Sequence, residues 1–200
     1  MSDKTHQSKQ PLFDHFGLLA PVYERLIRPP QSSPLFELMS PMDVRTVLDV
    51  GGGTGRCSQL FAERDARIVV VDVSYPMLVQ SGTHVALSPV LGSAESLPFE
   101  DSAFNRIMAV DSFHHFRDRD FAAKELLRVL APHGRLIIEE PDIRRFSVKL
   151  VALGETLLFM RSHFQPPGRI MRYFDVPGIQ VRLFENGTLN FWVIVDKKSS

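Results

Sequence analysis

Short apolar runs alternate with amphipathic segments along the chain from Thr46 onward. The runs "TVLDV" (46–50) and "RIVVVDVS" (67–74) are rich in β-branched residues, which predicts strands that are buried on both faces. Between them, "GRCSQLFAER" (55–64) carries apolar side chains at helical spacing and predicts a helix. The regular part of the chain therefore opens with a strand, a helix and a second strand.

The same alternation continues as far as Pro141, which is expected to end the last strand of the series. The further segments predicted are a helix at 77–81, strands at 89–92 and 104–111, a helix at 119–130 and a strand at 135–140. In the helix at 119–130, the positions expected to face the core are Phe121, Leu126, Leu127 and Leu130. Gly134 is expected to adopt the left-handed conformation that ends many helices.

Strands that alternate with helices indicate an α/β fold with a mostly parallel, doubly wound, Rossmann-like sheet. The end of the chain differs, because two strand-like runs at 179–184 and 189–197 are joined by "ENGT", and Asn-Gly is a strong hairpin signal. We therefore expect an antiparallel C-terminal hairpin. Residues 1–40 are predicted to be a helical lead-in and residues 41–200 a single domain, with an apolar helical insertion at about 142–178.

Composition narrows the classes of function. The chain has 200 residues, with 23 Lys and Arg against 23 Asp and Glu, so a strongly electrostatic partner such as nucleic acid is not expected. Cys57 is the single cysteine, which excludes an internal disulfide and a multi-cysteine metal site, and no metal is predicted. Residues 1–10 lack the apolar core of a signal peptide, and we expect a cytoplasmic protein.

The strand at 46–50 runs into a loop with three alternating glycines, Gly51, Gly53 and Gly55. A dinucleotide-binding G-x-G-x-x-G loop would require a further glycine where the chain has Arg56 or Ser58. The observed spacing favours a cofactor that lacks a pyrophosphate and carries an ammonium group, which Asp49 could meet directly or through water. The alternative for Asp49 is a carboxylate that only caps the turn.

Several motifs, in order, resemble the class I S-adenosylmethionine-dependent methyltransferases, over roughly Phe13 to Lys197. The stretches that carry the resemblance are "VLDVGGGTG" (47–55), "VVVDVSYPML" (69–78), "GSAESLPFEDSAFNRIMAVDSFHHF" (92–116) and "ELLRVLAPHGRLIIEEPD" (125–142). The lead-in "FDHFGLLAPVYERL" (13–26) is similar to the start of the ubiquinone/menaquinone biosynthesis C-methyltransferase branch, in which the tyrosine, here Tyr23, approaches the cofactor.

The resemblance implies S-adenosylmethionine as cofactor, with Asp72 holding both ribose hydroxyls. The residues implied to bind the cofactor are Tyr23, Asp49, Gly51, Gly53, Gly55, Asp72, Val73, Met77, Ser93 and Ala94. Family members commonly carry Asp at the position of Ser93, where it hydrogen-bonds the adenine amino group. Ser93 can accept the same hydrogen bond, but without the charge.

Asp111, His114 and His115 are the candidate catalytic residues, since the resemblance places the end of the strand at 104–111 beside the sulfonium. A histidine titrates near neutral pH and could deprotonate an acceptor. The alternative is that one histidine packs under the loop while the other is solvated. Metal binding by the pair is not expected, because adjacent side chains rarely point the same way.

The apolar insertion fits either a helix that packs on the sheet or a lid over an apolar acceptor. We predict a small-molecule acceptor, apolar or aromatic, that is methylated on carbon or oxygen. Basic residues near the insertion would also suit a membrane-surface contact through 142–164, and a homodimer is a further possibility. Two alternatives to a methyltransferase stay open, namely an inactive cofactor-binding module or partner subunit and an NAD-dependent oxidoreductase.

Overall fold

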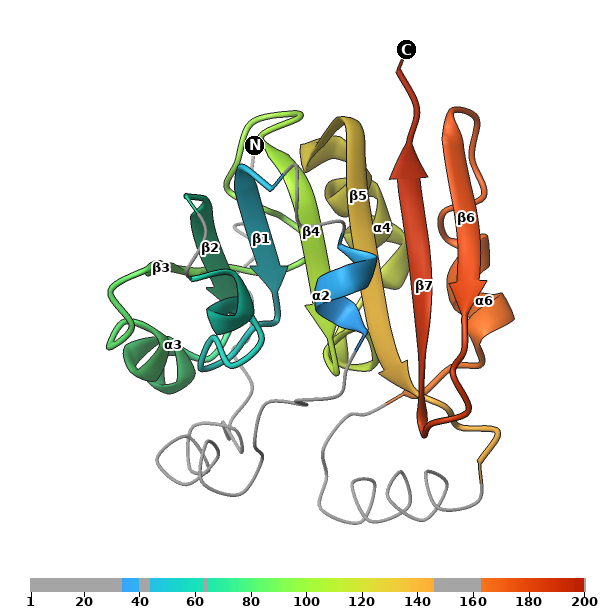
Figure 1. Cartoon of the computed structure of the whole chain (residues 1–200), viewed down its shortest axis with the longest axis horizontal. Coiled ribbons are helices and arrows are strands. Elements are labelled where there is room, and N and C mark those ends of the chain that lie inside the picture. Colours follow the sequence, from blue (N-terminus) through green and yellow to red (C-terminus); the bar gives the residue numbers. More distant parts are fainter. Residues whose placement is uncertain (1–33, 40–43, 63–64, 146–162, 200) are drawn as a thin grey trace, which may run out of the picture.

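The computed structural model describes residues 34–39, 44–62, 65–145 and 163–199. Seven strands form one sheet in the order β3-β2-β1-β4-β5-β7-β6 (Figure 1). The strands are β1 (Thr46–Val50), β2 (Arg67–Asp72), β3 (Leu87–Leu91), β4 (Phe104–Val110), β5 (Leu130–Pro141), β6 (Ile179–Phe184) and β7 (Asn190–Lys197). The first five are parallel, and β7 lies antiparallel between β5 and β6. This arrangement confirms the predicted Rossmann-like α/β fold and its C-terminal hairpin.

Helices cover both faces of the sheet. The described helices are α2 (Leu35–Leu38), α3 (Tyr75–Ser81), α4 (Arg119–Val129) and α6 (Pro167–Arg172), with two short 3-10 helices, η2 (Ser58–Phe61) and η3 (Phe113–His115). One core unites α4 and α6 with one face, through side chains such as Leu126 and Phe174. A second core unites α2, η2 and α3 with the opposite face, on which Leu35 and Phe61 are buried (Figure 1).

The prediction of how α4 ends is wrong. Gly134 does not take the left-handed conformation; His133 does, with φ 58°. The reason is that Leu130 leaves α4 with an extended backbone (ψ 124°) and begins β5 at once. Gly134 serves a different purpose, because a Cβ at this position would lie 2.7 Å from the carbonyl oxygen of Ala131.

Helical spacing also misplaced one apolar residue and one helix. Phe121 is 59% exposed, because the buried stripe of α4 runs through Ala122, Ala123, Leu126 and Val129 instead. Where a helix was predicted over 55–64, the structure has the short η2, with residues 63–64 outside the described part.

Some predictions fall outside the described residues. Tyr23 and residues 1–33 of the lead-in are among them, as is the greater part of the insertion, 146–162. Within the described ranges, no helix has the length and apolar character needed to cross a bilayer. The division into a lead-in and a single domain therefore stays a prediction.

Candidate functional site

The predicted site residues that the structure describes gather at the carboxyl ends of the parallel strands. β1 and β4 are neighbours in the sheet, while β2 and β3 continue to one side of β1 and β5 continues to the other side of β4. The strand order thus reverses between β1 and β4, and ligands of open α/β sheets bind at such a point. The glycine loop follows β1, Asp72 ends β2, and Asp111 follows β4.

Of the three alternating glycines, Gly53 is the one with open space at the position that a side chain would occupy. All three have positive φ, at 71° for Gly51, 56° for Gly53 and 80° for Gly55. A Cβ on Gly55 would lie 2.4 Å from Leu87 Cδ1, and one on Gly51 would lie 2.6 Å from Ser112 Cβ. The nearest atoms to a Cβ on Gly53 are Asp72 Oδ2 and Met77 Sδ, each at 4.0 Å. The loop therefore packs tightly at its two ends and leaves space beside Gly53.

Asp72 borders that space and is held by two backbone amides. The Gly53 N–H donates to Asp72 Oδ2 at 2.9 Å, and the Ser74 N–H donates to Oδ1 at 2.8 Å. The following residue, Val73, is 73% exposed, whereas Met77 on α3 is 3% exposed. Asp72 and Val73 thus lie at the strand end next to the glycine loop, and the contact of Asp72 with a ribose stays a prediction.

Asp49 lies beneath the loop and is 1% exposed. The Ser58 hydroxyl donates to its Oδ2 at 2.8 Å, and a Cβ on Gly52 would lie 2.5 Å from its Cγ. Burial raises the pKa of Asp49 to about 7; the Ser58 hydrogen bond opposes this rise and the charge of Asp72 adds to it. In this position Asp49 supports the loop, and its predicted contact with the ammonium group of a cofactor stays a prediction.

The loop after β3 carries Ser93 and Ala94, and Ala94 is 6% exposed. The Ser93 hydroxyl donates to Glu95 Oε2, while Glu95 Oε1 accepts from the backbone N–H groups of Arg117 at 2.7 Å and Asp118 at 3.2 Å. Glu95 thus fastens this loop to the start of α4. Sequence reasoning did not single out Glu95, because its amide partners lie 22 and 23 residues away.

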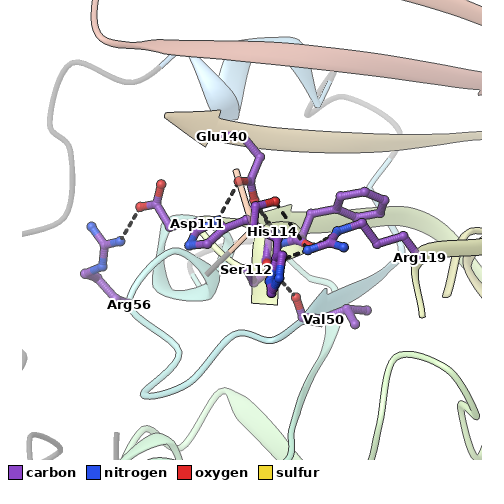
Figure 2. A network of polar contacts seen from close by, with 9 residues as sticks. Val50, Arg56, Asp111, Ser112, His114, Arg119 and Glu140 are labelled. Carbon is purple, nitrogen blue, oxygen red and sulfur yellow. Dashed lines mark hydrogen bonds and ion pairs between the residues drawn. The ribbon is translucent and has the colours of Figure 1, made fainter. Parts of the chain in front are cut away.

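Asp111 stands at the tip of β4 with an unusual backbone. Its φ is 49°, in the left-handed region that non-glycine residues seldom occupy. Arg56 Nη2 approaches its Oδ2 at 3.5 Å and so links the glycine loop to β4 (Figure 2). Burial, followed by the charges of Glu140 and Glu139, raises the pKa of Asp111 to about 6. The side chain is nonetheless 37% exposed, so solvent screens part of this effect.

His114 is oriented by Glu140, a residue on β5. His114 Nδ1 lies 2.6 Å from Glu140 Oε2, with side-chain exposures of 5% and 2% (Figure 2). Glu140 Oε1 accepts from the backbone N–H of Phe113 at 2.8 Å and from that of His114 at 3.4 Å. Since a carboxylate can only accept, His114 donates from Nδ1, which fixes the tautomer of its neutral ring. The sequence offered no signal for this pairing.

The segment after the insertion packs on the same histidine. The ring of Phe164 stacks on the ring of His114, with centroids 4.1 Å apart. The ring of His115 also contacts the ring of His114, at a centroid distance of 4.0 Å. Arg119 Nη2 donates to the carbonyls of His114 at 2.6 Å and His163 at 3.3 Å, which joins η3 to residues 163–164. Burial, with the charges of His114 and Arg119, lowers the pKa of His115 to about 3, which makes it a weak base at neutral pH.

Glu139 points to the opposite face from Glu140 and is equally buried, at 1% exposure. Its Oε1 accepts from Asn190 Nδ2 at 2.8 Å. Neither glutamate at the end of β5 therefore faces solvent. Among the residues with defined positions, no group of three or more His, Cys, Asp or Glu side chains is placed to hold a metal ion.

Comparisons with known proteins agree with this geometry. Residues 48–138 match the family described as "Methyltransferase domain". The chain is 30% identical to methyltransferase GfsG of Streptomyces halstedii, over 72% of this chain and 52% of that protein. It is 36% identical to the demethylmenaquinone methyltransferase of Thermobifida fusca, over 47% of this chain and 42% of that enzyme. A SAM-dependent methyltransferase structure from Thermotoga maritima superposes with a TM-score of 0.73 at 21% identity, over 92% of this chain and 98% of that one.

The match to the methyltransferase domain family, the methyltransferase relatives and the shared fold support a class I S-adenosylmethionine-dependent methyltransferase domain in this chain. S-Adenosylmethionine is the cofactor that the family and the fold imply. The chain spans about half the length of the curated relatives it matches, 52% of GfsG and 42% of the T. fusca enzyme.

The described residues fit this cofactor. The open flank of Gly53 adjoins Asp72, so backbone can approach a ligand whose sugar lies at the carboxylate. Two acids, Asp72 and Asp111, flank the loop and would complement a cofactor with an ammonium and a sulfonium group. The same acids oppose a diphosphate, and the position of a third dinucleotide-loop glycine is held by Arg56 or Ser58.

Proposed function

We propose that the protein transfers a methyl group from S-adenosylmethionine to a carbon or oxygen of a small, apolar or aromatic acceptor. The observation that carries the proposal is the space beside Gly53, which lies next to the carboxylate of Asp72 at the strand-order reversal. Bound there, the cofactor supplies an electrophilic methyl group on a positively charged sulfur.

In this proposal the chain holds the cofactor at three places. Asp72 accepts from the ribose hydroxyls while the amides of Gly53 and Ser74 keep its carboxylate in place. Val73 packs on the base, for which its 73% exposure leaves room, and Ser93 and Ala94 border the edge of the base. Asp49, with Gly51 and Gly55, shapes the loop around the amino-acid end. Tyr23 is proposed to approach the cofactor on the resemblance alone.

The acceptor side is proposed to lie at the tip of β4. Asp111 is partly exposed there, and burial among other acids gives it a pKa of about 6, which suits a group that accepts a proton near neutral pH. His114 is the second candidate, since Glu140 fixes its Nδ1 as a donor. His115 is the weakest of the three predicted catalytic residues, because its pKa is about 3.

Methyl transfer from a sulfonium releases a neutral thioether, so the leaving group needs no acid catalyst. The protein mainly has to align the acceptor with the methyl group and exclude water. Aromatic side chains support an apolar acceptor at this place. Phe116 packs 5.3 Å from Phe113 between ring centroids, and Phe164 stacks on His114. The demethylmenaquinone methyltransferase of T. fusca is consistent with an aromatic acceptor such as a quinone precursor.

Three further expectations concern partners. A homodimer, and a membrane contact through 142–164, stay proposals. Arg144 and Arg145 pair with Asp142, and Arg144 also pairs with Glu185, so the charges of these two arginines are matched by acids within the protein. The formal net charge of zero agrees with the expected lack of a nucleic-acid partner.

A thermal-shift titration with S-adenosylmethionine, S-adenosylhomocysteine and NAD tests the cofactor. A ligand at a hundred times its dissociation constant adds about 2.7 kcal/mol to the free energy of unfolding. Stabilisation by NAD alone would overturn the proposal. A panel of phenols, quinols and amines, read by mass spectrometry for the methylated product, then separates an active enzyme from a module that binds the cofactor without turnover.

A further inference from the structure

We propose that Glu95 sets the hydrogen-bonding sense of Ser93, and that the pair selects a cofactor base with an amino group over one with a carbonyl at the same position. The inference rests on the proposed function, in which Ser93 borders the edge of the base. It assigns Glu95 as a positioning residue that acts through the Ser93 hydroxyl.

The hydrogen bond to Glu95 determines where the hydroxyl hydrogen of Ser93 points. Glu95 Oε2 accepts from the Ser93 hydroxyl, and Glu95 Oε1 accepts from the N–H groups of Arg117 and Asp118 at 2.7 and 3.2 Å. An ionised carboxylate has no hydrogen to donate in return. The Ser93 oxygen also accepts from the Glu95 backbone N–H at 3.4 Å. With its single hydrogen directed to the Glu95 carboxylate, the Ser93 hydroxyl can act towards a ligand only as an acceptor, through its remaining lone pair.

Several hydrogen bonds hold the pair in one arrangement. The Ser96 N–H donates to the Ser93 carbonyl at 3.1 Å and closes a tight turn around Glu95. Asp118, whose amide Glu95 accepts, is the N-cap of α4, and its side chain accepts from Asp120 N and Phe121 N. Further along the loop, Glu125 accepts from Leu97 N at 2.8 Å. The Glu95 carboxylate therefore cannot turn away from Ser93 without losing its hydrogen bonds to the start of α4.

An oriented acceptor distinguishes two purine bases. The amino group of adenine is a donor and pairs with the lone pairs of Ser93, whereas the carbonyl of hypoxanthine at the same position is an acceptor and faces them without a hydrogen. A hydrogen bond to a carboxylate also polarises the hydroxyl, which strengthens Ser93 as an acceptor. The Ser93–Glu95 pair thus presents an acceptor to the base, with the negative charge one hydrogen bond further from it.

The isosteric variant Glu95→Gln gives a sharp test, because it reverses the polarity at Ser93. The Gln carbonyl oxygen must face the amides of Arg117 and Asp118, so the Gln NH₂ group faces Ser93 and donates to its oxygen. The hydroxyl hydrogen is then released towards the ligand. Ser93→Ala removes the hydroxyl altogether, and Ser88→Ala, at an exposed serine on β3, is the matched control.

The measurement is calorimetric titration of the full chain with S-adenosyl-L-homocysteine and S-inosyl-L-homocysteine. We expect the wild type and Ser88→Ala to prefer the adenosyl compound by roughly tenfold or more. Ser93→Ala should lose most of that preference, and Glu95→Gln should shift it towards the inosyl compound. Melting curves of all four proteins confirm that each is folded.

The outcomes separate this inference from the proposed function. If the wild type binds the adenosyl compound and Glu95→Gln and Ser93→Ala keep the wild-type ratio, the role of Glu95 is refuted and the cofactor site stands. If the wild type binds neither compound, the proposed function and the inference fail together. Should Glu95→Gln unfold, the ratio measured for Ser93→Ala alone decides whether Ser93 reads the base.

Discussion

The Ser58 hydroxyl donates a hydrogen bond to the buried carboxylate of Asp49 at 2.8 Å. The pair ties η2 to the end of β1 directly under the glycine loop. One hydroxyl offsets only part of the cost of burying a charge, which is why burial raises the pKa of Asp49 to about 7. This relationship leads to a prediction about pH.

Asp49→Asn should change how stability depends on pH. The folded protein holds a proton on Asp49 up to about pH 7, whereas the unfolded chain releases it near the ordinary aspartate pKa of 3.8. The contribution of Asp49 is therefore fully present below about pH 4 and declines as the pH rises to 7, by on the order of 4 kcal/mol. Urea unfolding at pH 5 and pH 8 should show the variant gaining on the wild type at the higher pH. Asp65→Asn, at an exposed aspartate, is the control; an unchanged gap between variant and wild type would contradict the prediction.

Gly53→Ala and Gly178→Ala separate backbone strain from ligand binding. The two glycines have φ values of 56° and 82°, and a Cβ on either meets no atom closer than 4.0 Å. Both variants should therefore lose about 1 kcal/mol of unfolding free energy through the left-handed backbone. Only Gly53→Ala should weaken binding of S-adenosylhomocysteine, by roughly tenfold or more, because it fills the open flank beside Asp72. Equal affinities in calorimetry would remove Gly53 from the cofactor site.

Glu140→Gln should reverse the tautomer of His114. The Gln carbonyl oxygen can still accept from Phe113 N, which places the NH₂ group towards His114 Nδ1 and makes that nitrogen the acceptor. Nitrogen chemical shifts of the imidazole report the change directly. If His114 deprotonates the acceptor, the turnover number should fall by a factor of roughly 10² or more. Glu139→Gln, which alters the buried glutamate on the other face, should leave the His114 shifts in place.

Arg119→Lys should loosen the segment that follows the insertion. The guanidinium contacts three carbonyls, those of Phe113, His114 and His163, and one ammonium group cannot span them. The His163 N–H, which donates to the His114 carbonyl at 3.0 Å, should then exchange its hydrogen faster. Hydrogen exchange read by mass spectrometry over residues 163–166 measures this. Arg117→Lys, at an exposed arginine near the start of α4, should leave the exchange rate as it is.

The sequence predicts features that depend on neighbouring residues and misses those that depend on distant ones. The apolar runs at 46–50 and 67–74 predict buried strands correctly, because a run of β-branched residues is visible without knowing what packs on it. The same local reasoning places Asp72 and Asp111 at strand ends. It fails at Gly134, which is expected to cap the preceding helix but lies inside β5. It also fails at Phe121, because Ala122 and Ala123 lie on the buried side of α4 instead.

The hydrogen-bond partners of the site residues cannot be predicted from the local sequence pattern, because they lie far away along the chain. Glu140 meets His114 because β5 lies next to β4 in the sheet, 26 residues further along the chain. Arg119 reaches His163 across 44 residues and the whole insertion. Such pairings follow from strand order and helix placement, so they become visible only once the sheet is assembled.

Arg128 of α4 makes several of the contacts that hold the loop between β3 and β4. Arg128 donates to the carbonyls of Leu97 and Phe99 and to the carboxylates of Asp101 and Glu125, and its own carbonyl accepts from Ser102 N. The conformation of this loop is therefore fixed when α4 packs on the sheet, before any ligand binds. If the cofactor binds beside this loop as proposed, it meets a preorganised surface, so little conformational entropy of the loop is lost on binding and selectivity depends on the fit of the cofactor.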